Sequence, residues 1–223
     1  MDNPLHITAL KYAQSVLSEA MCFFGGDPNK TRPISFTLYL IEEGDQKILV
    51  DAGCDTMPGF VMEHFVSPVE ILARYGLSPE EITDLVITHA HHDHIEAAHY
   101  FSKATLHIQQ EECAAGRSYL PPEITVRCFA QEAQISPSVR AVCIGGHAKG
   151  SSIVTVEADK TYVICGDECY QRECLTKTIP TGSTCCMEKS RAFVETYGRP
   201  EFVALLCHDP EILPGSNGFL SVL

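Results

Sequence analysis

Apolar residues are grouped along the chain in short runs, most of them too short for a buried helix. The clearest pair is Ile34 to Ile41 and Lys47 to Val50, which are joined by Glu-Glu-Gly-Asp-Gln. This pattern predicts two strands connected by a hairpin turn around Gly44 and Asp45. Further runs, each predicted as a strand, are Leu85 to Thr88, Thr105 to Ile108, Val139 to Ile144, Ser152 to Glu157, Thr161 to Cys165 and Phe202 to Cys207.

Helix signals lie between these strands. Ser67-Pro68-Val69-Glu70 has the form of a capping box with proline at the first helical position. Ser78-Pro79-Glu80-Glu81 predicts a second helix start with acidic residues in its first turn. Gln110 to Ala115 and Cys185 to Tyr197 are also predicted as helices, whereas Tyr119 to Phe129, with its two prolines, is interpreted as a loop.

Strands that alternate with helices in this way favour sheets that carry helices on their outer faces. The chain has 223 residues, with no internal repeat and no composition shift that would mark a linker. We therefore expect a single domain over residues 1–223.

The charge of the chain narrows the choice of partners. Sixteen basic and 29 acidic residues give a net charge of −13, which argues against a nucleic acid or an anionic membrane surface as partner. Met1 to Leu10 has neither the basic region nor the long apolar run of a secretory signal, so a cytoplasmic location is predicted. The eleven cysteines form no Cys-x-x-Cys pair and are interpreted mostly as buried thiols.

The densest chemical signal is His89-Ala90-His91-His92-Asp93-His94, directly after the strand predicted at Leu85 to Thr88. On a helix, residues two apart point in different directions, so His89 and His91 cannot share a helical face. In a loop that leaves a strand, His-x-His can hold one ion, and Asp93 and His94 can turn to a second ion nearby. Imidazole and carboxylate donors suit zinc, with iron or manganese as alternatives.

Three more potential ligands also follow apolar runs. Gly145-Gly146-His147 follows Val142-Cys143-Ile144, Gly166-Asp167 follows Val163-Ile164-Cys165, and His208 follows Leu205-Leu206-Cys207. A lone histidine or aspartate at a strand end is commonly structural. Three of them downstream of a His-x-His-x-Asp-His cluster favour a shared metal site, and the glycines would let the backbone turn each ligand inward.

These motifs, in this order, resemble the metallo-β-lactamase superfamily, and Asp51-Ala52-Gly53 matches that superfamily's early acidic motif. The resemblance covers the chain from about Ile34 to Asp209 and implies an α/β (α+β) fold, the αββα sandwich, with the site at one edge between two sheets. It implies the following roles: His89, His91 and His147 bind the first metal, Asp93, His94 and His208 bind the second, Asp167 bridges both, and Asp51 orients a ligand histidine. His92, His6, His64, His99 and His107 match no ligand position.

Within the superfamily, the chain is most similar to the N-acyl homoserine lactone lactonases, the quorum-quenching lactonases. They have a tyrosine three residues after the bridging aspartate, as Tyr170 follows Asp167 here. The resemblance implies that a metal-bridging hydroxide opens a lactone or related cyclic ester. Tyr170 would stabilise the oxyanion, and Asp93 would pass a proton to the leaving alkoxide. The implied cofactors are two zinc ions, the partner is a small-molecule substrate, and a homodimer is possible by analogy.

Two stretches depart from the lactonase pattern. Ile95 and Glu96 stand where many lactonases have a small pair, and Lys149 and Ser151 replace proline and histidine of Gly-His-x-Pro-Gly-His. These departures leave a smaller lactone, or a cyclic amide or ester, open as the substrate beside an acyl homoserine lactone. Two other reactions also stay open. They are thioester hydrolysis of the glyoxalase II type, although the 15 residues after His208 leave no room for that enzyme's helical domain, and persulfide oxidation at a single iron.

Overall fold

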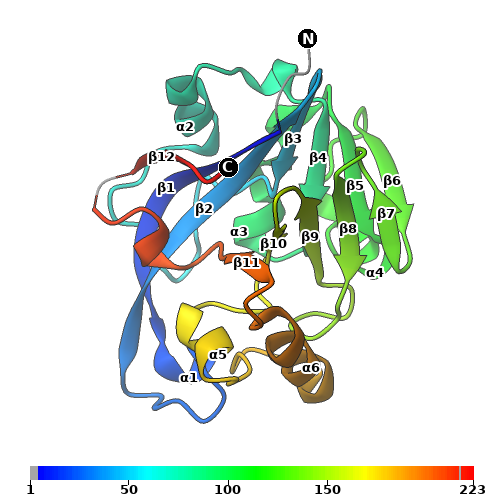
Figure 1. Cartoon of the computed structure of the whole chain (residues 1–223). Helices are drawn as coiled ribbons and strands as arrows, with labels where there is room; N and C mark the ends of the chain where they lie inside the picture. The colour runs from blue at the N-terminus through cyan, green and yellow to red at the C-terminus, as the bar shows by residue number, and fades with distance from the viewer. Residues whose placement is uncertain (1–4, 216) are drawn as a thin grey trace.

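The computed structural model describes residues 5–215 and 217–223, and its framework is two β-sheets that lie face to face (Figure 1). The larger sheet has the order β12-β1-β2-β3-β4-β5-β6, with β1 (His6–Ser18), β2 (Thr31–Glu43), β3 (Gln46–Val50), β4 (Asp84–Ile87), β5 (Thr105–Gln109), β6 (Thr125–Phe129) and β12 (Gly218–Ser221). The smaller sheet has the order β11-β10-β9-β8-β7, with β7 (Glu132–Gln134), β8 (Val139–Cys143), β9 (Ser152–Glu157), β10 (Thr161–Ile164) and β11 (Phe202–Leu205).

The core follows from the alternation of side chains along each strand, because successive residues point to opposite faces of a sheet. Alternate residues such as Ile48 and Val50 of β3 meet Val154 and Val156 of β9 in one buried cluster between the sheets. Leu49, between the first two, belongs to a second cluster that also includes residues of the outer helices. Both faces of the strands are therefore buried, which explains their nearly continuous apolar sequences.

The helices are short and lie on the outside of the sheets (Figure 1). They are α1 (Glu19–Cys22), α2 (Pro68–Tyr75), α3 (His92–Ile95), α4 (Gln110–Ala115), α5 (Arg172–Thr176) and α6 (Met187–Tyr197), with 3₁₀ turns at Pro79–Glu81, Glu96–Phe101, Arg117–Tyr119 and Pro210–Ile212. This arrangement confirms the αββα sandwich. Within the described ranges, no helix is both long and apolar enough to cross a bilayer.

Most of the predicted elements are confirmed. The hairpin joins β2 to β3 with Glu43 paired to Gln46, so the turn is Gly44-Asp45. The oxygen of Ser67 accepts a hydrogen bond from the Glu70 amide at the start of α2, as its capping motif predicts.

The helix start at Ser78-Pro79-Glu80-Glu81 is confirmed, with Glu80 and Glu81 in the first turn, but the helix is a single 3₁₀ turn that ends at Ile82, which is extended and buried. One local prediction is wrong. The segment from Tyr119 to Phe129 is not all loop: its second half is β6, which pairs in parallel with β5.

The longest strand that the sequence pattern misses is β1, which pairs along β2 with a bulge between Lys11 and Ala13. Lys11 is almost fully buried, yet its ammonium group donates hydrogen bonds to the carbonyl oxygens of Leu213 (2.7 Å) and Gly215 (3.1 Å). A lysine in the middle of a buried strand hides the apolar pattern, and its partners lie about 200 residues away in sequence.

Candidate metal centre

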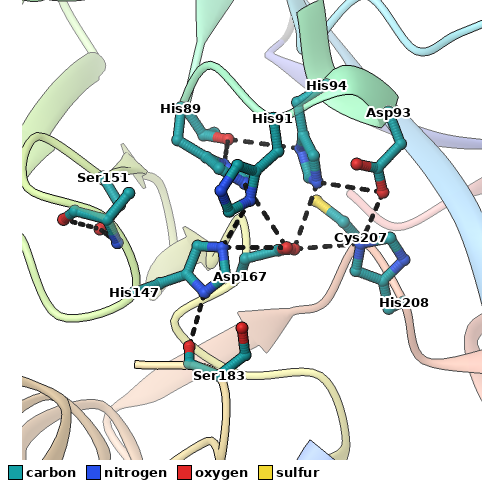
Figure 2. Close-up of polar contacts among 12 residues, drawn as sticks. His89, His91, Asp93, His94, His147, Ser151, Asp167, Ser183, Cys207 and His208 are labelled. Atoms are coloured by element: carbon teal, nitrogen blue, oxygen red, sulfur yellow. Dashed lines mark hydrogen bonds and ion pairs between the residues drawn. The ribbon is translucent and has the colours of Figure 1, made fainter. Parts of the chain in front are cut away.

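The seven residues predicted as ligands converge at one end of the two sheets (Figure 2). His89, His91, Asp93 and His94 come from the segment after β4, His147 from the loop between β8 and β9, Asp167 from the segment after β10, and His208 from the segment after β11. Each sheet therefore supplies part of the cluster. Strand ends are where the backbone can turn a polar side chain inward, which explains the common position of all seven.

Local backbone structure separates the His-x-His-x-Asp-His motif into two parts. His91 has an extended backbone and immediately precedes α3, so His89 and His91 lie in the loop before the helix. Asp93 and His94 lie within the single turn of α3 and point to a different position. This is the division that the sequence predicts for two ions.

The first group consists of His89, His91, His147 and Asp167, whose candidate donor atoms all lie within 4.8 Å of one another. Nδ1 of His91 is 3.0 Å from Nε2 of His89 and 2.9 Å from Nε2 of His147. Three ring nitrogens this close need a shared proton or a cation between them.

The second group consists of Asp93, His94 and His208. Oδ2 of Asp93 is 3.6 Å from Nε2 of His94 and 3.5 Å from Nε2 of His208. All three side chains are largely buried, so bulk water provides little solvation for these donors.

Asp167 lies between the two groups (Figure 2), and each of its two oxygens is near one of them. Its Oδ2 is 3.5 Å from Nε2 of His89 and 3.6 Å from Nε2 of His147. Its Oδ1 is 3.3 Å from Nε2 of His94 and 3.0 Å from Nε2 of His208. Among the described residues, Asp167 is therefore the one whose geometry suits a bridge.

The position of Asp167 depends on the glycine before it. Gly166 has a φ of +55°, and a Cβ on it would come within 3.0 Å of the Thr88 side chain. Only glycine adopts this left-handed conformation at so close a contact without strain. Glycine at position 166 therefore allows the turn that directs Asp167 into the cluster.

The outward ring nitrogens are held by oxygen atoms. Nδ1–H of His147 donates to the Ser183 carbonyl oxygen (2.7 Å), and Nδ1–H of His208 donates to the Ser35 carbonyl oxygen (2.8 Å). A carbonyl oxygen can only accept, so each ring presents the lone pair of Nε2 to the cluster. Such outer contacts fix both tautomer and orientation in metal sites.

Asp51 makes the corresponding outer contact with the ring of His94. Its Oδ2 is 2.7 Å from Nδ1 of His94, and its two oxygens also accept hydrogen bonds from the amide and the hydroxyl group of Thr88. The Thr88 oxygen lies 3.1 Å from Nδ1 of His89. Since its own proton goes to Asp51, Thr88 can accept the proton of Nδ1–H of His89, which again leaves Nε2 free to bind an ion.

Electrostatics keep His89 and His91 neutral. Burial lowers the pKa of His89 well below its usual range, and the nearby His94 lowers it further. Burial and the neighbouring His147 also lower the pKa of His91. Neutral imidazole is the form that binds a metal ion.

For Asp167 and His94, in contrast, the surroundings favour the charged form. Burial opposes the ionisation of Asp167, but His208, His94 and His89 outweigh burial and hold its pKa well below the usual value. Burial likewise opposes the protonation of His94, but the surrounding carboxylates, Asp167 and Asp51 foremost, raise its pKa well above the ordinary value. The site therefore favours positive charge at this position.

Three buried atoms at the centre fit a bound cation. Nε2 of His94, Nε2 of His208 and Oδ1 of Asp167 are inaccessible to solvent and make no well-oriented hydrogen bond within residues 5–215 and 217–223. Buried polar atoms without partners are costly. Nitrogen and carboxylate donors of this type are the ligands that zinc, iron and manganese accept, so the residues fit the metals that the sequence implies.

A cavity of about 250 Å³ opens beside the cluster. Its polar wall is His91, His92, Asp93, Asp167, Tyr170, Ser183 and His208, and its apolar wall is Leu17, Met21, Ile34, Phe36, Met57 and Phe60. No lysine or arginine of the described chain lines it. The sequence pattern missed the apolar wall, because its residues come from three distant segments and carry no chemical signature.

Tyr170 lies in the cavity wall with 6% of its surface exposed. Its ring stacks on His208 with centroids 5.2 Å apart and planes 20° apart. Burial raises the pKa of its phenol well above 10, and the charges of Asp167 and Asp93 raise it further, so the hydroxyl group stays protonated and can donate.

The residues that depart from the lactonase pattern have local roles. Lys149 is exposed, and neither it nor Glu96 lines the cavity. Glu96 accepts a hydrogen bond from the Asp55 amide (2.8 Å), and Ile95 is buried in the core. The hydroxyl group of Ser151 donates to the carboxylate of Glu168. The other five histidines, His6, His64, His92, His99 and His107, lie outside both groups.

Comparisons with known proteins place these features in a family. The N-acyl homoserine lactonase of Bacillus cereus is 23% identical over 209 residues, which cover 81% of this chain and 84% of that protein. Metallo-beta-lactamase domain-containing protein 1 of Mus musculus is 31% identical over 123 residues, 54% of this chain and 44% of the mouse protein. This chain therefore matches less than half of the mouse protein's length.

Solved structures share the fold. A quorum-quenching N-acyl homoserine lactone hydrolase superposes with a TM-score of 0.81 at 18% identity and covers 96% of both chains. The dizinc quorum-quenching lactonase AidC superposes with a TM-score of 0.74 at 14% identity and covers 99% of this chain and 95% of its own.

The family model of the metallo-beta-lactamase superfamily matches residues 37–192, well over half of the chain. This range contains six of the seven residues of the cluster, from His89 to Asp167. The chain belongs to the metallo-beta-lactamase superfamily and is a hydrolase related to the lactonases, with a His/Asp cluster able to bind metal.

Proposed function

We propose that this protein is a two-metal hydrolase that opens a lactone or related cyclic ester bearing an apolar group. The observation that carries the proposal is the cavity, where Tyr170 and the two donor groups form one wall and apolar side chains form the other. Ring oxygen and carbonyl would face the polar wall, and an acyl or alkyl substituent would face residues such as Met21 and Phe60.

Zinc is the metal that we propose for both positions. His89, His91 and His147 would hold one ion, and Asp93, His94 and His208 the other, with Asp167 shared between them. Two ions held this close would lower the pKa of a water molecule and polarise the substrate carbonyl. These are the two effects that lactone hydrolysis at neutral pH needs.

The remaining roles belong to side chains in the cavity wall. Tyr170 keeps its proton, so its hydroxyl group can donate a hydrogen bond to the carbonyl oxygen as negative charge develops there. Asp93 lies at the cavity as well as in the second donor group, so it is suited to pass a proton to the leaving alkoxide.

The charge of the cavity favours a neutral substrate over the alternatives. A glutathione thioester carries carboxylates, and the described cavity wall offers no lysine or arginine to pair with them. The second donor group argues against the single iron of a persulfide dioxygenase. It offers three possible ligands, and Nε2 of His94 and Nε2 of His208 are buried without a hydrogen-bond partner, so a second ion would satisfy them.

The test is hydrolysis of a lactone panel by zinc-loaded protein, followed in a pH-stat. The panel spans short and long N-acyl homoserine lactones and small unsubstituted lactones, with thioesters and β-lactams as controls. We expect turnover of lactones and none of glutathione thioesters. Protein that holds two metal ions and opens no lactone would refute the proposal.

A further inference from the structure

Two loops of the first donor group come from different sheets, so their spacing needs a physical link. His89 and His91 lie after β4 of the larger sheet, whereas His147 lies in residues 145–151, the His147 loop, between β8 and β9 of the smaller sheet. A shift of either loop would change the distance between Nε2 of His147 and Nδ1 of His91, which now lie 2.9 Å apart.

Glu112 connects the two loops directly. Its Oε2 accepts a hydrogen bond from the Ala90 amide (2.9 Å), between His89 and His91. Its Oε1 accepts one from the Gly150 amide (2.8 Å) in the His147 loop. The side chain is only 5% exposed, and hydrogen bonds to a buried carboxylate are short and strong.

The close approach of the His147 loop to α4 explains Gly150. A Cβ on this residue would overlap Oε1 of Gln109 and lie 3.0 Å from Cγ of Glu112. A side chain here would therefore displace the Gln109 side chain and crowd that of Glu112. The glycine thus permits the hydrogen bond that Glu112 accepts.

A second buried carboxylate holds the other end of the same loop. Oε1 of Glu168, whose residue is 0% exposed, accepts hydrogen bonds from the amides of Gly146 (3.1 Å) and His147 (3.2 Å). It also accepts the hydroxyl proton of Ser151. Glu168 follows β10, so it connects the His147 loop only to another part of the smaller sheet. Glu112 lies in α4, after β5, so it connects this loop to the larger sheet.

We propose that Glu112 is a positioning residue that sets the distance between His147 and the His89–His91 pair, and so controls metal affinity at the first group alone. It is not itself a ligand, because both of its oxygens are occupied by backbone amides. None of Asp93, His94 and His208 is hydrogen-bonded to Glu112. The inference rests on the proposed metal-binding role of the cluster, but not on the substrate.

The experiment compares zinc binding by Glu112→Gln, Glu112→Asp and Glu111→Gln with the parental protein. Gln removes the charge and one acceptor, whereas Asp keeps the charge but is too short to hold both amides. Glu111 is exposed on the same helix, so its variant controls for loss of a nearby charge. Metal-free protein is titrated with zinc against a chromophoric chelator, and both dissociation constants are determined.

We expect both Glu112 variants to bind one zinc ion as the parental protein does and the other about 10- to 100-fold more weakly, the loss typical of a perturbed outer contact. Glu111→Gln should bind both ions normally. Parental affinities in Glu112→Asp, or equal weakening of both ions, would overturn the proposal. If one Glu112 variant does not fold, the other carries the test. Absence of lactone turnover would count against the proposed function only, since the readout here is binding.

Discussion

Replacing Tyr170 with phenylalanine isolates one hydroxyl group in the reaction. The ring is 6% exposed and stacks on His208, and phenylalanine keeps both the ring volume and this contact. Metal content and thermal stability should therefore stay unchanged, while the hydrogen-bond donor is lost.

The magnitude follows from the role of that donor. Loss of one oxyanion donor typically lowers kcat by about 100- to 1,000-fold. The lower end applies here, because the metal ions would also stabilise the oxyanion, so we expect a fall of about 100-fold, which corresponds to about 2.7 kcal/mol of transition-state free energy.

The assay is steady-state hydrolysis of the best lactone by both proteins at equal zinc occupancy. KM should change little, because the donor acts mainly as charge develops in the transition state. A kcat within threefold of the parental value would remove Tyr170 from the mechanism. A loss of zinc in the variant would show that the hydroxyl group supports the site rather than the reaction.

Three further predictions concern aspartates. Asp167→Ala should lose both zinc ions and all activity together, as measured by metal analysis, and retention of either ion would contradict its shared position. Asp51→Asn, which offers one acceptor oxygen in place of two, should weaken zinc binding by about 10- to 100-fold without preventing folding, whereas parental affinity would exclude its orienting role. Burial favours the protonated form of Asp84, but hydrogen bonds from His107, Thr83 and Gln46 outweigh burial and lower its pKa. Because the pKa is lower in the folded state, the carboxylate stabilises the fold above about pH 4, and this stabilisation disappears as the pH falls further. Asp84→Asn should therefore lower the free energy of unfolding by about 1 kcal/mol at pH 6 and by less at a pH below 4, as followed by urea denaturation; an equal loss at both pH values would contradict this reasoning.

The sequence predicts the donor cluster well because the ligands follow short apolar strands. Each run such as Val163 to Cys165 is buried on both faces, so a polar residue directly after it stands out. Figure 2 shows the side chains that follow these strands meeting at one place, as the pattern implies. The sequence also predicts the split of the His-x-His-x-Asp-His motif between two positions, but the structure supplies its cause: α3, which the sequence pattern does not predict, begins between His91 and Asp93.

Other features have no local signal. Lys11 interrupts the apolar pattern of β1, and only its distant carbonyl partners make its burial tolerable. Glu112 and Glu168 have the appearance of ordinary surface acids, and only the tertiary structure shows that backbone amides surround them. The apolar cavity wall depends on residues as far apart as Leu17 and Phe60.

The division of the donors between two sheets has a consequence for folding. The larger sheet carries His89 and His91, and the smaller sheet carries His147 and Asp167. Bound ions would therefore act as removable cross-links that join the halves of the sandwich. An ion present at 100 times its dissociation constant, and bound by the folded state alone, adds about 2.7 kcal/mol to the free energy of unfolding. The supply of metal to the protein would then set its lifetime as well as its activity.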